Sequence, residues 1–247
     1  MNHYGLIGFP LTHSFSQRYF TDKFIREGIT DCQYDLYELP DINELSAILQ
    51  TPGLRGLNVT IPHKQAVFPF LHRLDTSAQR VGAVNVIKLE ADGSRTGYNS
   101  DYYGFRQSLQ NWFRELGLSP FEGKALVMGT GGASKAVIAA LADLAIPYRL
   151  VSRQSSADTL TYTDLPAVID QYQLIINCSP VGTFPHENEA PALPYAQLTG
   201  QHLLYDLVYN PAETRFMQLG CERGAAVMNG YDMLVLQAEK AWEIWQR

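Results

Sequence analysis

The sequence predicts an α/β protein with two domains. Short apolar runs alternate with segments of helical periodicity along most of the chain, as in folds that pack helices on a mostly parallel sheet. The length of 247 residues exceeds the usual size of about 150 residues for one domain. A new strand–turn–helix pattern also begins after Gly117. We therefore expect a domain junction near residue 100 and the end of the second domain near Met228.

The first half predicts a mixed sheet. Its expected strands cover residues 4–9, 32–39, 56–61 and 84–89, and its expected helices cover 14–28 and 42–49. Pro10 and Pro62 end two of the strands, and Ser14 or Ser16 is positioned to cap the first helix. Asp92-Gly93 predicts a hairpin after the last strand, so the sheet need not be purely parallel.

The second half predicts a doubly wound sheet of parallel strands. We expect strands at 124–128, 148–152, 174–177 and 203–206, and helices at 104–116, 135–144 and 214–223. The last segment, 231–245, carries an apolar stripe at helical spacing, which predicts a helix with one face packed against the rest of the protein.

Composition excludes several classes of protein. Hydrophobic residues make up 46% and charged residues 18%, and the net charge is −6, which opposes a nucleic-acid surface because phosphate binding needs clustered positive charge. The sequence contains no run of about 18 apolar residues, so we expect no membrane span. We also find no positively charged leader followed by an apolar stretch, and so expect no secretion signal. The three cysteines are far apart and are expected to be small buried residues, neither paired nor zinc-bound. We expect a cytoplasmic protein, monomeric or homodimeric, without a metal.

A glycine-rich turn follows the strand at 124–128. In Gly129-Thr130-Gly131-Gly132-Ala133, glycines at 129 and 131 permit a tight turn, and the following helix N-terminus offers N–H groups to phosphate oxygens. This context predicts a dinucleotide site. The alternative is a glycine-rich loop with no ligand.

The end of the next strand bears on which dinucleotide binds. Ser152-Arg153 stands where NAD enzymes usually place an acidic residue for the ribose 2′-hydroxyl. Arginine instead matches a 2′-phosphate, so the sequence favours NADP (NADPH). An Arg153 that is only a solvated surface cation remains the alternative.

Three polar clusters follow strands of the first domain. They are His13 to Ser16, Asn58 to Lys64, and Asn85 together with Asn99-Ser100-Asp101. Open α/β sheets bind ligands at the carboxyl ends of their strands, which predicts a site here. Taken singly, Ser14 reads as a helix cap, Lys64 as a surface charge and Asp101 as an N-cap.

Together these clusters resemble the shikimate dehydrogenase family over essentially the whole chain. The matching stretches are 8–10, 13–16, 58–64, 82–85, 99–101, 129–133, 177–182, 205–209 and 230–238. The resemblance implies an enzyme that reduces 3-dehydroshikimate to shikimate with NADPH, in chorismate and aromatic amino-acid biosynthesis. It also implies a Rossmann-like nucleotide domain, 101–229, and a substrate domain formed by 1–100 plus 230–247, to which the C-terminal helix returns.

The resemblance also implies roles for individual residues. Lys64 and Asp101 match the catalytic pair. The implied substrate contacts are Ser14, Ser16, Thr60, Asn85, Asp101, Tyr209 and Gln237. The implied cofactor contacts are Gly129, Thr130, Gly131, Gly132, Ala133, Ser152, Arg153 and Gly230.

Two other functions share these features. A quinate/shikimate dehydrogenase of broader specificity would carry the same motifs. A catalytically silent NADP-binding sensor would not need both Lys64 and Asp101, and their presence argues against it.

Overall fold

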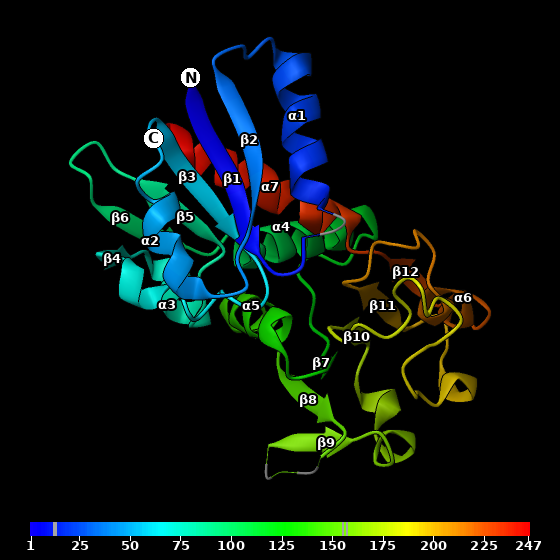
Figure 1. Cartoon of the computed structure of the whole chain (residues 1–247). Helices are drawn as coiled ribbons and strands as arrows, with labels where there is room; N and C mark the ends of the chain where they lie inside the picture. The colour runs from blue at the N-terminus through cyan, green and yellow to red at the C-terminus, as the bar shows by residue number, and fades with distance from the viewer. Residues whose placement is uncertain (12–13, 155, 157) are drawn as a thin grey trace. The chain divides into compact units, whose positions relative to one another are not determined.

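The computed structural model describes residues 1–11, 14–154, 156 and 158–247 (Figure 1). His13, part of the first polar cluster, lies outside the described residues. The chain forms two compact units, Met1–Tyr103 with Gln237–Arg247, and Gly104–Leu236. We call them unit 1 and unit 2.

Unit 1 is built on a mixed six-stranded sheet of order β2-β1-β3-β5-β6-β4. Its strands are β1 (Asn2–Gly8), β2 (Cys32–Glu38), β3 (Leu54–Val59), β4 (Arg73–Leu74), β5 (Val86–Leu89) and β6 (Arg95–Tyr98). Its helices are α1 (Phe15–Glu27), α2 (Leu45–Ile48) and α3 (Thr76–Val81), and α4 (Ser100–Glu115) begins in it. Strand β1 pairs in parallel with β2 and β3, whereas β5 runs antiparallel to β3 and β6.

Alternating side chains give this sheet two buried faces. On β1, Leu6 belongs to a core that includes Phe20 of α1, and its neighbour Ile7 belongs to a second core on the other face. The first core also holds Ala241 and Trp245 of α7 (Tyr231–Gln246). The expected return of the C-terminal helix to the first domain is confirmed, and burial of its apolar stripe explains it.

Unit 2 is built on a parallel six-stranded sheet of order β12-β11-β10-β7-β8-β9. Its strands are β7 (Ala125–Met128), β8 (Tyr148–Ser152), β9 (Thr159–Thr161), β10 (Leu174–Asn177), β11 (Leu203–Asp206) and β12 (Ala226–Met228). Its own helices are α5 (Gly132–Asp143) and α6 (Arg215–Cys221). This is the doubly wound order, with its switch point between β7 and β10. The predicted α/β class with a Rossmann-like half is therefore confirmed.

Several boundaries differ from the prediction. Strand β3 ends at Val59 and not at residue 61, because the chain turns at once: the His63 N–H donates to the Thr60 carbonyl at 2.9 Å. Helix α4 begins at Ser100 and α5 at Gly132, each a turn earlier than expected. The expected helix at 42–49 is a 3₁₀ turn, Ile42–Glu44, followed by the short α2.

The cysteines differ from the expectation that each is buried. Cys221 is exposed, and Cys32 and Cys178 are partly buried.

None of the helices in the described part of the chain has both the length and the apolar character needed to span a bilayer.

Candidate functional site

A lysine and an aspartate meet at the carboxyl edge of the unit 1 sheet. The Lys64 ammonium donates from Nζ to Oδ2 of Asp101 at 2.6 Å, although 37 positions separate them in the sequence. Their side chains are 25% and 17% exposed, so both are accessible to a ligand. The structure thus brings together the two residues that the family resemblance assigns to catalysis.

The turn that carries Lys64 is held at two points. Buried His63 contacts the Leu39 carbonyl, at the end of β2, through Nε2 at 2.7 Å. The Lys64 carbonyl accepts from the Val84 N–H at 2.8 Å, just before β5. These bonds restrain the backbone at residues 63 and 64, from which the lysine side chain reaches Asp101.

Asp101 is held by the first turn of α4. The side chain of Asn99 accepts from the Tyr102 N–H at 3.0 Å and donates to the Ala83 carbonyl at 2.9 Å. Asn99 is therefore the helix cap, and the simple interpretation of Asp101 as an N-cap is wrong. With capping done by Asn99, the Asp101 carboxylate is available to pair with Lys64.

A buried polar network joins two of the predicted substrate contacts. Asn85 accepts from the Ser100 N–H at 2.6 Å and donates to its hydroxyl at 3.0 Å. That hydroxyl in turn donates to Oε1 of Gln237 at 3.3 Å. Asn85 and Gln237 are 3% and 8% exposed, and both bond to Ser100, a residue to which sequence reasoning gave no role.

The network continues toward α1. The Tyr34 hydroxyl donates to Oδ1 of Asn58 at 2.6 Å, and Asn58 donates to the Asn85 carbonyl at 3.3 Å. Burial raises the pKa of Tyr34, and a hydrogen bond with Ser16 opposes that shift. Ser16 is therefore tied to the same network. Tyr34 was missed because, on an alternating strand, it is indistinguishable from a core residue.

The other two predicted substrate contacts of unit 1, Ser14 and Thr60, lie next to the end of a helix or strand. Ser14 is the N-cap of α1 and accepts from the Gln17 N–H at 3.3 Å. Thr60 follows β3 directly, and its N–H donates to the Ile7 carbonyl at 2.9 Å. Thr60 therefore lies at the carboxyl ends of β1 and β3, and Ser14 lies at the start of α1.

In unit 2 the glycine-rich turn crosses from β7 to α5. Gly129 has φ = 100°, a backbone conformation that favours glycine, and a Cβ there would make a tight contact, 3.3 Å, with the backbone of Cys178 and Ser179. Gly131 caps α5, Gly132 opens it, and the Ser134 hydroxyl donates to the Gly131 carbonyl at 2.7 Å. Thr130 to Ala133 are exposed, and the first N–H groups of a helix have no intrahelical acceptor.

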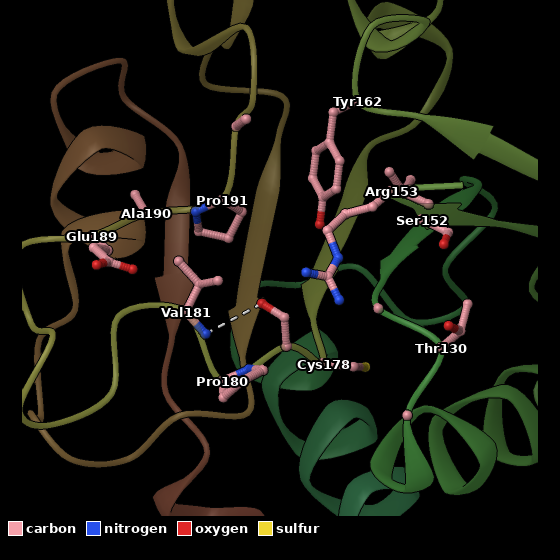
Figure 2. Close-up of a pocket in the computed structure, with 15 residues that line it drawn as sticks. Thr130, Ser152, Arg153, Tyr162, Cys178, Pro180, Val181, Glu189, Ala190 and Pro191 are labelled. Atoms are coloured by element: carbon pink, nitrogen blue, oxygen red, sulfur yellow. Dashed lines mark hydrogen bonds between the residues drawn. The ribbon is translucent and has the colours of Figure 1, made fainter. Parts of the chain in front are cut away.

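This turn opens onto a cavity of about 820 Å³ (Figure 2). Thr130, Ser152 and Arg153 line one side of it, and the loop after β10 and the segment Glu189 to Ala192 line the other. The cavity fits a dinucleotide with a 2′-phosphate, because the glycine turn that leads into α5 and the Arg153 guanidinium line the same space.

A second buried network holds the loop that follows β10. Asn177 donates to Oδ1 of Asp206 at 2.9 Å and accepts from the Ser179 hydroxyl at 2.6 Å. Oδ2 of Asp206 accepts from the Thr214 hydroxyl at 2.6 Å, and Oδ1 also accepts from the Val208 N–H at 3.0 Å. Burial raises the pKa of Asp206 from 3.8 to about 6, against these three hydrogen bonds.

Asp206→Asn should change how stability depends on pH. Since the native state holds the Asp206 proton more tightly than the unfolded state does, the unfolding free energy falls as pH rises from about 4 to about 6. The loss is on the order of 3 kcal/mol for a shift of about two units. The amide stays neutral, so urea denaturation should show the wild type losing this much relative to the variant between pH 4 and pH 7. Asp170→Asn, at an exposed carboxylate of unit 2, is the control. A constant difference between wild type and Asp206→Asn would contradict the prediction.

Two predicted site residues lie elsewhere in unit 2. Tyr209, expected to contact substrate, is 38% exposed, and burial of part of its side chain raises its pKa. Gly230, expected to contact cofactor, does not line the cavity among the described residues. A Cβ at Gly230 would lie 2.2 Å from the Leu207 carbonyl oxygen, so close packing alone requires glycine there.

Comparison with known proteins gives consistent matches. The substrate binding domain of shikimate dehydrogenase matches residues 6–87. The shikimate dehydrogenase (NADP(+)) of Carboxydothermus hydrogenoformans is 35% identical, over 98% of this chain and 90% of that protein. The shikimate dehydrogenase (NADP(+)) of Clostridium beijerinckii is 37% identical, over 100% of this chain and 92% of that protein.

Solved structures agree over the same length. Shikimate 5-dehydrogenase from Thermus thermophilus, in complex with NADP(H) and shikimate, has a TM-score of 0.84 at 27% identity and covers 99% of this chain and 93% of its own. Quinate dehydrogenase from Corynebacterium glutamicum, in complex with NAD, has a TM-score of 0.87 at 26% identity. The match covers 99% of this chain and 93% of that one. With relatives above 30% identity matching along its whole length, this chain belongs to the shikimate dehydrogenase family.

Proposed function

We propose that this chain is an NADP-dependent shikimate dehydrogenase that reversibly reduces 3-dehydroshikimate to shikimate, in chorismate and aromatic amino-acid biosynthesis in the cytoplasm. The observation that carries the proposal is the Lys64–Asp101 pair at the carboxyl edge of the unit 1 sheet. Family membership supports the substrate, and the cavity beside the glycine turn supports the cofactor.

Oxidation of a secondary alcohol removes a hydride from carbon and a proton from oxygen. When bound, NADP supplies the hydride acceptor for this chemistry and NADPH the donor for its reverse. During oxidation the neutral amine form of Lys64 takes up the hydroxyl proton and becomes the ammonium, and during reduction the ammonium gives that proton to the carbonyl oxygen. Asp101 orients that nitrogen through its 2.6 Å contact.

The substrate carboxylate fits the start of α1. Capping uses the Ser14 oxygen as an acceptor and leaves the hydroxyl hydrogen to donate to an anion. The helix N-terminus also favours negative charge. We assign Ser14 and Ser16 to the carboxylate, so the capping role and the binding role of Ser14 are compatible.

The ring hydroxyls need hydrogen-bond donors and acceptors. Thr60, Asn85, Gln237 and Tyr209 supply them, together with Asp101. Asn85 and Gln237 are oriented by their shared bonds to Ser100, which restricts the groups they can turn toward a ligand. No residue in this set requires a metal.

The residues that would hold the cofactor come from unit 2. The turn from Gly129 to Ala133 would bind its pyrophosphate through the N–H groups at the start of α5, and Ser152 and Arg153 would bind its 2′-phosphate. The assignment of Gly230 rests on the family resemblance alone. We also propose a substrate domain, 1–100 plus 230–247, and a nucleotide domain, 101–229. Units 1 and 2 have their boundaries three and seven residues away from these, and Asp101 itself lies in unit 1.

A quinate/shikimate dehydrogenase remains the second candidate, because a quinate dehydrogenase shares the fold over the whole chain. The test is to mix the purified protein with shikimate or quinate and with NADP or NAD, and to follow nicotinamide absorbance. We expect reduction of NADP with shikimate to be fastest. Equal rates with quinate would establish the broader specificity, and no reduction in any mixture would reject both candidates in favour of a silent binding module.

A further inference from the structure

The ends of β8 and β9 lie along one side of the unit 2 cavity, at Ser152, Arg153 and Tyr162. Residues 153–158 alone join the two strands, which pair in parallel. Parallel neighbours usually need a crossover of a dozen or more residues, most often helical. Here the short connection brings the end of β9 directly beside the end of β8, where the 2′-phosphate of the proposed cofactor would lie.

The strand register places a tyrosine next to Arg153. Ser152 pairs with Thr161, so the next residues along the two strands are Arg153 and Tyr162. Both side chains line the cavity, and Figure 2 shows the Tyr162 ring extending into it with the hydroxyl end toward Arg153. The ring is partly buried against the core that contains Val151, Leu165 and Phe216.

The chemistry of this pair suits a phosphate dianion. Burial raises the pKa of Tyr162, while the charge of Arg153 lowers it, so the phenol remains a proton donor. A phosphate offers three strong acceptor oxygens, and an arginine fork occupies two of them. A neutral hydroxyl beside the fork can donate to the third. A ribose 2′-hydroxyl offers a single oxygen and gains much less from two donors.

We propose that the Tyr162 hydroxyl is a second donor to the ribose 2′-phosphate, acting with Arg153, and is therefore a determinant of the preference for NADP over NAD. The inference rests on the proposed function for the identity of the cofactor. It assigns to Tyr162 a role that depends on the short β8–β9 connection of this chain.

The test measures binding directly, by isothermal titration with 2′,5′-ADP and with 5′-AMP, which differ only in the phosphate. Tyr162→Phe keeps the ring and removes the hydroxyl. It should weaken the binding of 2′,5′-ADP about 10-fold, as expected for loss of a hydrogen bond to a charged group. The binding of 5′-AMP should be unchanged. Tyr172→Phe, which removes a hydroxyl against the same core, is the matched control and should bind both probes like the wild type.

Two outcomes overturn the inference. Tyr162→Phe binding both probes like the wild type would show that the hydroxyl makes no contact, and equal losses for both would show that it does not act on the phosphate. Failure of the proposed function looks different: the wild type would not oxidise shikimate with either nucleotide, while the probe titrations would still report on Tyr162.

Discussion

Lys64→Ala should lower the turnover of shikimate by about 10²–10⁴, the usual contribution of a positioned acid or base. The variant loses the only amine that the proposed mechanism places at the reacting oxygen. His63 and Val84 hold the backbone of this turn through bonds that do not involve the lysine side chain, so the fold should persist. Steady-state rates, together with circular dichroism and a titration with NADPH, measure both parts of the prediction.

Lys88→Ala is the matched control. Lys88 also lies in unit 1 and pairs with an acidic residue, Glu90, at 3.1 Å, but it lies on β5 and has no role in the proposed chemistry. Its turnover should stay near that of the wild type. A Lys64→Ala enzyme that is folded and turns over at the wild-type rate would refute the assignment of Lys64 as acid and base.

Arg153→Ala should weaken the binding of NADPH by about 10- to 100-fold and the binding of NADH very little. Charge-assisted hydrogen bonds contribute about 1.5–3 kcal/mol, and only NADPH carries the phosphate that receives them. The measurement is the dissociation constant of each nucleotide, with kcat/KM for each as the functional counterpart.

Arg149→Ala provides the control, because Arg149 is an exposed arginine on β8, the strand that precedes Arg153, and does not line the cavity. It removes the same charge from unit 2 at a different place. Equal losses of NADPH and NADH in Arg153→Ala, or equal effects of the two substitutions, would remove the argument that Arg153 selects NADP.

The parts of the fold that sequence predicts best are those fixed by local signals. The Ser14 cap, the left-handed Gly28 that ends α1, and the glycine turn after β7 each depend on a few adjacent residues. Elements without such signals were missed. Strand β9 has only three residues, Thr159–Thr161, and its parallel pairing with β8 is a tertiary property that no periodicity records.

In the candidate site too, local signals do not predict the contacts between distant segments. Local reasoning took Asp101 for a helix cap, because an acidic residue at a helix start usually has that role. The structure gives the cap to Asn99 and pairs Asp101 with Lys64. That pairing depends on where β3 ends and α4 begins, so only the resemblance to a family indicated it beforehand.

The bonds that orient the site were not predicted at all. Ser100 joins Asn85 to Gln237, and Tyr34 joins Ser16 to Asn58, through contacts between segments far apart in sequence. Serine and tyrosine at such positions carry no distinguishing pattern. Their roles follow from the folded arrangement.

The central claim is that Lys64 and Asp101 contact the hydroxyl that is oxidised. A crystal structure of the protein with bound shikimate and NADP tests it most directly. We predict Lys64 Nζ within about 2.6–3.2 Å of one ring hydroxyl, with Asp101 on the same oxygen or on Nζ. A ring bound with that hydroxyl far from residue 64, and the ammonium directed into solvent, would contradict the account.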